Sequence, residues 1–115
     1  MESLINKNTN EQIVRFIDRA YSFWDRVKGL LGKGSLPDSY ALWILPCPVI
    51  HTFFMKFPID VIFVDKNLKV VSVFHSIPSR RIIYGGWKSH SVFELQANKL
   101  QHFNIKKGDQ LYVGH

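Results

Sequence analysis

Apolar residues in the first third of the chain follow a helical period. The stripe begins after Ser22, which can cap a helix with Asp25 three residues later, and it ends before Gly32 and Gly34. A glycine at that place can adopt the left-handed conformation that closes a last helical turn. The apolar members of the stripe are Phe23, Trp24, Val27, Leu30 and Leu31. The pattern predicts one amphipathic helix here, with its aromatic residues packed in the core.

From residue 41 onward the pattern changes to that of β-strands. β-Branched and aromatic residues dominate 41–45, 51–57, 59–65, 68–77 and 88–95, and a last strand is expected at 110–113. A short helix is expected over 97–103. The predicted fold class is therefore mainly β (α+β). We expect a compact single-domain, barrel-like sheet with one N-terminal amphipathic helix and one short C-terminal helix.

The strand at 59–65 is expected to be central in the sheet. Apolar side chains occupy both of its faces, with Asp60 near its start. A carboxylate in that position needs hydrogen-bond donors, because burying an unpaired charge is costly. His51, Thr52 and nearby backbone N–H groups are the candidate donors.

Three connections carry turn or loop signals. Residues 66–67, Lys-Asn, predict a hairpin turn after the central strand. Residues 76–86 have the length of a functional or mobile loop, and we interpret them as a flap. In the I-K-K-G-D segment, Gly108 is expected to adopt an unusual φ while Asp109 holds the backbone of the turn.

Length and composition indicate one domain. The chain has 115 residues, of which 46% are hydrophobic, and this fits a single core. Residues 1–11 are polar and are expected to form a flexible N-terminus, and 12–115 a single globular domain. That domain opens with a short strand or extended lead-in at 13–17. No apolar run resembles a signal peptide or reaches the roughly 20 residues of a membrane span, so a cytoplasmic location is expected.

The formal net charge is +6, and a basic surface attracts phosphate groups. However, the fifteen Lys and Arg residues are spread along the chain, with Arg80-Arg81 and Lys106-Lys107 as the tightest groups. No recognition-helix or aromatic-basic signature accompanies them. We therefore expect a solvated basic surface rather than specific nucleic-acid binding.

Residues 46–65 place reactive side chains in the most apolar part of the chain, in the order P-C-P-V-I-H-T-F-F-M-K-F-P-I-D-V-I-F-V-D. Buried polar groups need partners, so this segment is either a structural hydrogen-bond network or a site. We interpret it as part of a non-enzymatic binding module without a cofactor, with the 77–87 loop as a lid. The expected ligand-binding residues are His51, Thr52, Met55, Asp60, Arg80 and Arg81. The two arginines favour an acidic ligand, either a small molecule or a peptide.

Other interpretations of the same residues remain open. The motif can be purely structural, with function through protein–protein interaction, because a Phe run at strand spacing is usually core. Cys47, His51 and Asp60 suggest a thiol-dependent enzyme, although nothing in the sequence indicates an oxyanion hole. Cys47, His51 and Met55, spaced by four, are soft ligands that suit copper. Such residues are more often core packing, so no metal is predicted. The lone cysteine also excludes an internal disulfide.

Four motifs together resemble domain-of-unknown-function family 192. They are R-x-K-G-L-L-G at 26–32, the long central motif at 46–65, F-E-L-Q-A at 93–97 and I-K-K-G-D at 105–109. The resemblance extends over nearly all of the chain from Ile13 to Val113. It implies a small β-rich, barrel-like domain with short helices, found in bacteria and archaea. The family has no established activity, so the resemblance implies a fold and names no substrate.

Overall fold

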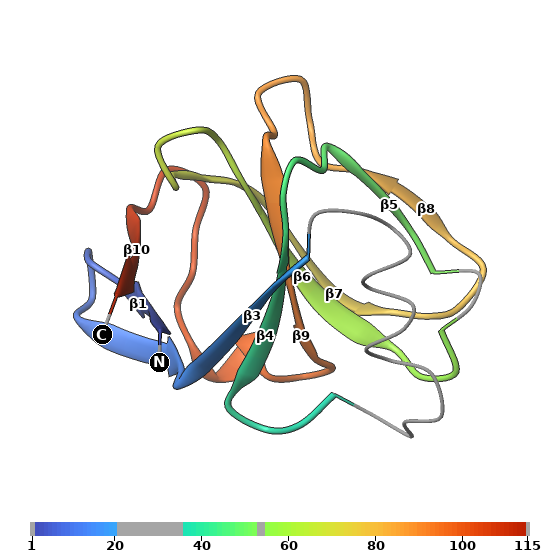
Figure 1. The fold of residues 1–115 in the computed structure, drawn as a ribbon, viewed down its shortest axis with the longest axis horizontal. Coiled ribbons are helices and arrows are strands. Elements are labelled where there is room, and N and C mark those ends of the chain that lie inside the picture. Colours follow the sequence, from blue (N-terminus) through green and yellow to red (C-terminus); the bar gives the residue numbers. More distant parts are fainter. Residues whose placement is uncertain (1, 21–35, 53–54, 115) are drawn as a thin grey trace.

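The computed structural model describes residues 2–20, 36–52 and 55–114, and this part of the chain forms three β-sheets (Figure 1). The largest sheet has five strands in the order β3-β4-β9-β6-β7. A three-stranded sheet, β10-β1-β2, lies on one side of it, and a two-stranded sheet, β5-β8, lies on the other. The strands are β1 (Ser3–Asn6), β2 (Glu11–Val14), β3 (Phe16–Ala20), β4 (Tyr40–Ile44), β5 (Val49–His51), β6 (Ile59–Val64), β7 (Val70–Ile77), β8 (Ile82–Tyr84), β9 (Ser91–Gln96) and β10 (Leu111–Gly114).

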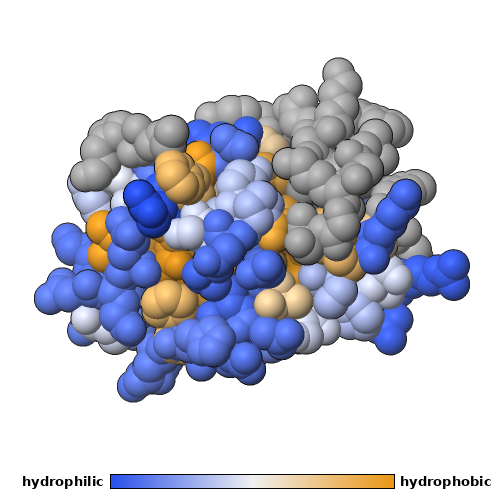
Figure 2. Space-filling model, turned by 90° about the horizontal axis from the view of Figure 1, so that it is seen from below, coloured by the Kyte–Doolittle hydropathy of each residue, from blue (hydrophilic) through white to orange (hydrophobic). Residues whose placement is uncertain are grey.

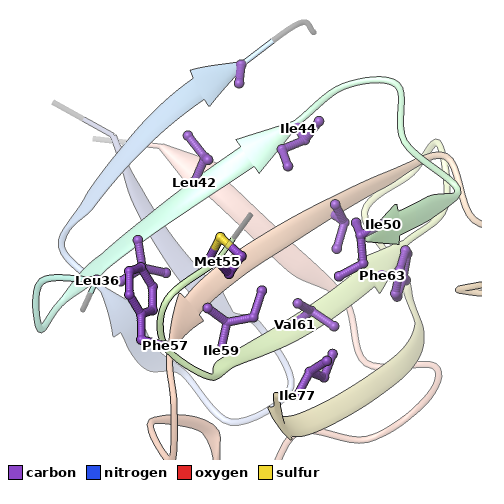
Figure 3. Packing of buried hydrophobic residues seen from close by; sticks show 12 residues of the cluster. Leu36, Leu42, Ile44, Ile50, Met55, Phe57, Ile59, Val61, Phe63 and Ile77 are labelled. Carbon is purple, nitrogen blue, oxygen red and sulfur yellow. The ribbon is translucent and has the colours of Figure 1, made fainter. Parts of the chain in front are cut away.

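Strand β6 is central, as its sequence predicted. It pairs antiparallel with β7 on one side and with β9 on the other, and all six of its residues are buried. Val61 and Phe63 face a core cluster on one side of the sheet, and Ile62 and Val64 face a second cluster on the other side. Figure 3 shows the first cluster, to which β4, β5 and β6 all contribute side chains. The alternation of side chains along a strand thus produces two cores from one sheet.

The prediction of one barrel-like sheet with two helices is wrong. The five-stranded sheet is open, with β3 and β7 as its edges, and the other strands form separate sheets. Residues 22–31, for which the N-terminal helix was predicted, lie outside the described residues. The described residues themselves contain no α-helix. The short C-terminal helix is only a 3₁₀ turn, η1 (Leu100–His102). Asn98 has a φ of 68°, a left-handed conformation that an α-helix over 97–103 does not accommodate.

The first residues of the chain belong to the folded structure. Strand β1 is the middle strand of its sheet, paired with both β2 and β10, and Leu4 is buried in the second core cluster. These contacts come from residues within 1–11, the segment for which a flexible N-terminus was predicted. A local pattern cannot indicate this pairing, because the partner strand β10 lies more than a hundred residues away in the sequence. In Figure 1 the first strand, β1, and the last strand, β10, accordingly lie side by side.

The surface of the described residues is largely polar on the face shown in Figure 2. Hydrophobic residues appear there only as separate small patches between hydrophilic ones. Isolated apolar residues of this kind are normal on a protein surface and do not indicate a binding site. Within the described ranges, no helix is long and apolar enough to cross a membrane.

Candidate functional site

Asp60 is fully buried and binds backbone groups from two other segments. Its Oδ1 accepts hydrogen bonds from the N–H groups of Ser76 (2.7 Å) and Asn98 (3.1 Å), and its Oδ2 accepts one from the N–H of Leu100 (2.9 Å). His75 Nδ1 lies 4.0 Å from Oδ2. The carboxylate therefore joins an irregular point of the β6–β7 pairing to the turn that precedes η1. Both Ser76 and Asn98 have positive φ, a backbone shape that these hydrogen bonds help to hold.

Thr52 has a similar role at the end of β5. Its hydroxyl donates to the carbonyl of Pro78 (2.7 Å) and accepts from the N–H of Arg81 (2.9 Å). Its backbone N–H donates to the carbonyl of Arg81 (2.9 Å), and its carbonyl accepts from the N–H of Arg80 (3.2 Å). The side chain is buried, so its hydroxyl holds the 78–81 loop against β5.

Replacing Thr52 with valine is expected to lower the free energy of unfolding by about 1–2 kcal/mol. The change keeps the shape of the side chain but removes both hydroxyl hydrogen bonds. Urea denaturation measures the loss, and hydrogen exchange of the Arg81 amide should become faster. Thr52→Ser is the matched control, because it retains the hydroxyl and should lose less. Equal stability of the valine variant and the parent would contradict this role.

The structure does not bring Cys47 and Asp60 together, although a thiol-dependent enzyme would need both of them beside His51. The backbone N–H of Cys47 donates to the carbonyl of His90, and the N–H of His90 donates to the carbonyl of Val64. Val64 lies at the opposite end of β6 from Asp60. Those two ends of the strand are roughly 13 Å apart. Met55 lies within the first core cluster (Figure 3). Among the described residues, no three His, Cys, Asp or Glu side chains form a group that can hold a metal ion.

The other predicted site residues, His51, Arg80 and Arg81, lie on or beside the two-stranded sheet. In the register of this sheet, His51 pairs with Ile82 and Val49 pairs with Tyr84. Side chains of directly paired residues lie on the same face, so these four share the outer face. Ile50 and Ile83 form the third pair and face the first core cluster.

This outer face is unusually apolar for an exposed surface. Ile82 is 67% exposed, Tyr84 57% and Val49 43%, whereas most side chains of this type are buried in the described structure. Arg80 and Arg81 are also exposed, and neither lies within ion-pair distance of a described carboxylate. The arrangement is an apolar strip beside two arginines whose charges are not neutralised by described residues.

One edge of strand β8 pairs with no other described strand. Its only partner among the described strands is β5. The N–H of Thr52 donates to the carbonyl of Arg81, and the N–H of Gly85 donates to the carbonyl of Pro48. Hydrogen-bonded and non-hydrogen-bonded pairs alternate along an antiparallel sheet, so the hydrogen-bonded pair between these two is Ile50 with Ile83. The N–H and C=O groups of Ile82 and Tyr84 therefore point away from β5. They form a short ladder of groups to which another strand can pair.

Tyr40 and Asp38 are two described residues whose surroundings shift their pKa. Burial, and then the hydrogen bond that the Tyr40 hydroxyl donates to Asp18 Oδ2 (3.0 Å), raise the pKa of Tyr40 well above its usual range. The hydrogen bond from Lys99, followed by the attraction of its charge, lowers the pKa of Asp38. Both shifts have structural causes, so they do not indicate a catalytic group.

The sequence pattern does not distinguish Val49, Ile82 and Tyr84 as site residues. In the printed sequence they are ordinary apolar residues of strand-like segments, and their alternation with Ile50 and Ile83 is the pattern of any half-buried strand. The only signal was that His51 belongs to this alternation, which places a polar group on the same face as the missed residues.

The described strands define a small domain built from three β-sheets. The sequence model of the DUF192 family, described as Uncharacterized ACR, COG1430, matches residues 4–113. A curated relative, the UPF0127 protein of Thermococcus sibiricus, is 31% identical over 114 residues, which cover 94% of this chain and 72% of the relative. The chain belongs to the DUF192 family, which confirms the resemblance seen in its motifs.

Two solved structures share the fold. A protein of unknown function from Novosphingobium aromaticivorans superimposes with a TM-score of 0.78 and 18% identity, and covers 96% of this chain and 82% of its own. A Sinorhizobium meliloti protein, named as a candidate transcription regulator, superimposes with a TM-score of 0.79 and 16% identity, and covers 97% of this chain and 91% of its own. Likeness at this level of identity concerns the fold alone.

Proposed function

We propose that this protein is a non-enzymatic binding module that binds an extended, acidic segment of a partner protein along β8. The observation that carries the proposal is the free edge of this strand, where exposed Ile82 and Tyr84 side chains accompany unpaired backbone groups. An added strand would gain main-chain hydrogen bonds from the edge and would bury its alternate side chains against these residues. This is the mode by which extended peptides bind to sheet edges.

The predicted ligand-binding residues contribute to this surface in two ways. His51 shares the outer face, and Arg80 and Arg81 precede β8, where they favour an acidic side chain of the partner. Thr52 supports the site indirectly, since its hydroxyl holds the loop that carries both arginines. Asp60 and Met55 belong to the underlying scaffold.

Three other edge strands in the described structure, β2, β3 and β10, are less suited to this function. Strand β2 carries Glu11 and Gln12 at exposed positions, and β3 carries Asp18 and Arg19. On β10 the exposed aromatic residue, Tyr112, has the Lys7 ammonium 5.5 Å from its ring centre. Charged side chains on an edge discourage pairing with another chain. Strand β8 itself has no charged residue.

A synthetic peptide that alternates valine with glutamate should bind, as measured by isothermal titration calorimetry. Methylating its alternate backbone nitrogens should weaken binding about tenfold, because the hydrogen bonds to β8 are lost. A peptide that alternates valine with lysine should bind more weakly still, since it meets Arg80 and Arg81 with the wrong charge. Hydrogen exchange of the Ile82 and Tyr84 amides should slow in the complex.

Variants locate the binding surface on the protein. The double variant Ile82→Glu/Tyr84→Glu should lose at least tenfold in affinity while its melting temperature stays close to that of the parent, because both side chains are exposed. Tyr112→Glu, on an edge strand of another sheet, is the matched control and should bind normally. Unchanged binding by the N-methylated peptide, or by the double variant, would refute the proposal.

A further inference from the structure

Two neighbouring hollows lie at the other end of the central sheet from Asp60. The larger has a volume of about 430 Å³ and the smaller about 340 Å³, and both are lined by Asp65, Trp87 and Lys88. The walls come from three turns that are far apart in sequence, near residues 65–69, 85–90 and 107–108. In Figure 1 these turns lie together along the top of the molecule. The larger volume is within the range of pockets that bind small molecules.

Trp87 is the most exposed large apolar residue in the described structure, at 82%. Its ring has the Lys88 ammonium 5.1 Å from its centre, a cation–π contact that places positive charge beside an aromatic surface. An exposed indole is a good stacking surface for another flat ring, and each such contact is favourable without requiring a particular ring. Val70 and Val71 add apolar surface to the same hollow.

The charges around the hollows are mostly positive. Four exposed lysines line them, namely Lys66, Lys69, Lys88 and Lys107. None lies within ion-pair distance of a described carboxylate. The one acidic group, Asp65, uses Oδ1 to accept hydrogen bonds from the N–H groups of Asn67 (2.8 Å) and Lys69 (3.0 Å). Its charge offsets one of the four lysines, so an anion is favoured overall.

We propose that these hollows are a site for a small phosphorylated aromatic molecule of the nucleotide class. The flat ring stacks on Trp87, and the phosphate lies among the lysines, whose compact ammonium groups suit a phosphate dianion. The site goes beyond the peptide-binding surface and uses different side chains. The two meet only where the chain leaves β8 and passes through Gly85 and Gly86 to Trp87.

AMP is the probe, and adenosine and inorganic phosphate are the matched comparisons. In ¹⁵N-labelled full-length protein, AMP should shift the indole N–H signal of Trp87 and the amide signals of Gly86, Lys88 and Gly108. Adenosine lacks the charge and phosphate lacks the ring, so each should bind at least tenfold more weakly than AMP. AMP affinity should also fall as salt concentration rises. Equal affinity for AMP and inorganic phosphate would overturn the proposal, because only a diffuse attraction for anions would then be present.

Variants test both halves of the site. Trp87→Ala should weaken AMP binding about tenfold through lost stacking. The double variant Lys69→Gln/Lys107→Gln should weaken it by a similar factor, whereas Lys56→Gln, an exposed lysine outside the hollows, should have no effect. Ile82→Glu/Tyr84→Glu should leave AMP binding unchanged, which separates this site from the peptide-binding surface. Unaltered AMP binding by Trp87→Ala would refute the proposal. Binding of a single-stranded oligodeoxythymidylate a hundredfold more tightly than AMP would also refute it, because the ligand would then be a nucleic acid and not a small molecule.

Discussion

Replacing Asp60 with alanine is expected to lower the free energy of unfolding by about 4 kcal/mol. The carboxylate accepts hydrogen bonds from three backbone N–H groups, and alanine would leave them without their acceptor. Each unsatisfied buried donor costs roughly 1–3 kcal/mol. Ser76 and Asn98 lie at exposed positions where water can replace the carboxylate, but the N–H of Leu100 is in a buried residue. The total loss of stability is therefore large, but it is smaller than the cost of leaving three fully buried N–H groups without an acceptor.

Urea denaturation of the alanine variant measures this loss. Asp60→Asn keeps one acceptor oxygen and should lose roughly half as much, about 2 kcal/mol. Asp38→Ala is the surface control, since the Asp38 side chain is 74% exposed and its ion pair with Lys99 should contribute little. If Asp60→Ala were as stable as Asp38→Ala, the buried carboxylate would not be holding these segments together.

Replacing Gly85 with alanine is expected to destabilise the protein by about 3 kcal/mol. A Cβ at this position would lie 2.2 Å from Phe63 Cδ1 and 2.5 Å from Ser89 Oγ. Phe63 is fully buried in the first core cluster, so its ring cannot move aside without disturbing other side chains. Thermal unfolding followed by circular dichroism should show a melting temperature lower by on the order of 10 °C.

Gly108→Ala separates this steric effect from backbone strain. Gly108 has a φ of 92°, but a Cβ there would meet no atom within 4 Å. Gly108→Ala should therefore lower the free energy of unfolding by only about 1–2 kcal/mol, the cost of a left-handed backbone at alanine. In the double variant Gly85→Ala/Phe63→Leu, the smaller side chain should recover part of the stability lost through the clash. A Gly85→Ala variant that unfolds at the parent's temperature would exclude the close packing described for this glycine.

The position of Gly85 links packing to both proposed binding surfaces. Its N–H donates to Pro48 and its carbonyl accepts from the Ser72 hydroxyl, so the backbone is fixed directly after β8. Ile82 and Tyr84 lie just before this point, and Trp87 lies two residues after it. The glycine therefore sets where the edge strand ends and where the exposed indole begins. A variant at Gly85 should consequently weaken peptide and AMP binding together, unlike the surface variants.

Local patterns predicted strands β4, β6, β7 and β9 of the central sheet to within a few residues, whereas β3 extends beyond the lead-in expected at 13–17. The strong β-forming character of 59–65 and its two apolar faces identified the central strand, and Gly108 and Asp109 have the turn roles expected of them. The hairpin after β6 is also present, although the positive φ falls on Leu68 rather than on Asn67. These features depend on neighbours in the sequence, where side-chain alternation and backbone preference act directly.

The sequence by itself determined the family, the strand-rich character of the chain, and the need for partners around Asp60 and Thr52. Only the tertiary structure decided that these partners are backbone groups of distant loops, and that Ile82, Tyr84 and Trp87 are exposed. The physical reason is that solvent exposure and edge position depend on which strands pair. Pairing joins residues as far apart as Leu4 and Val113, and no local periodicity carries that information.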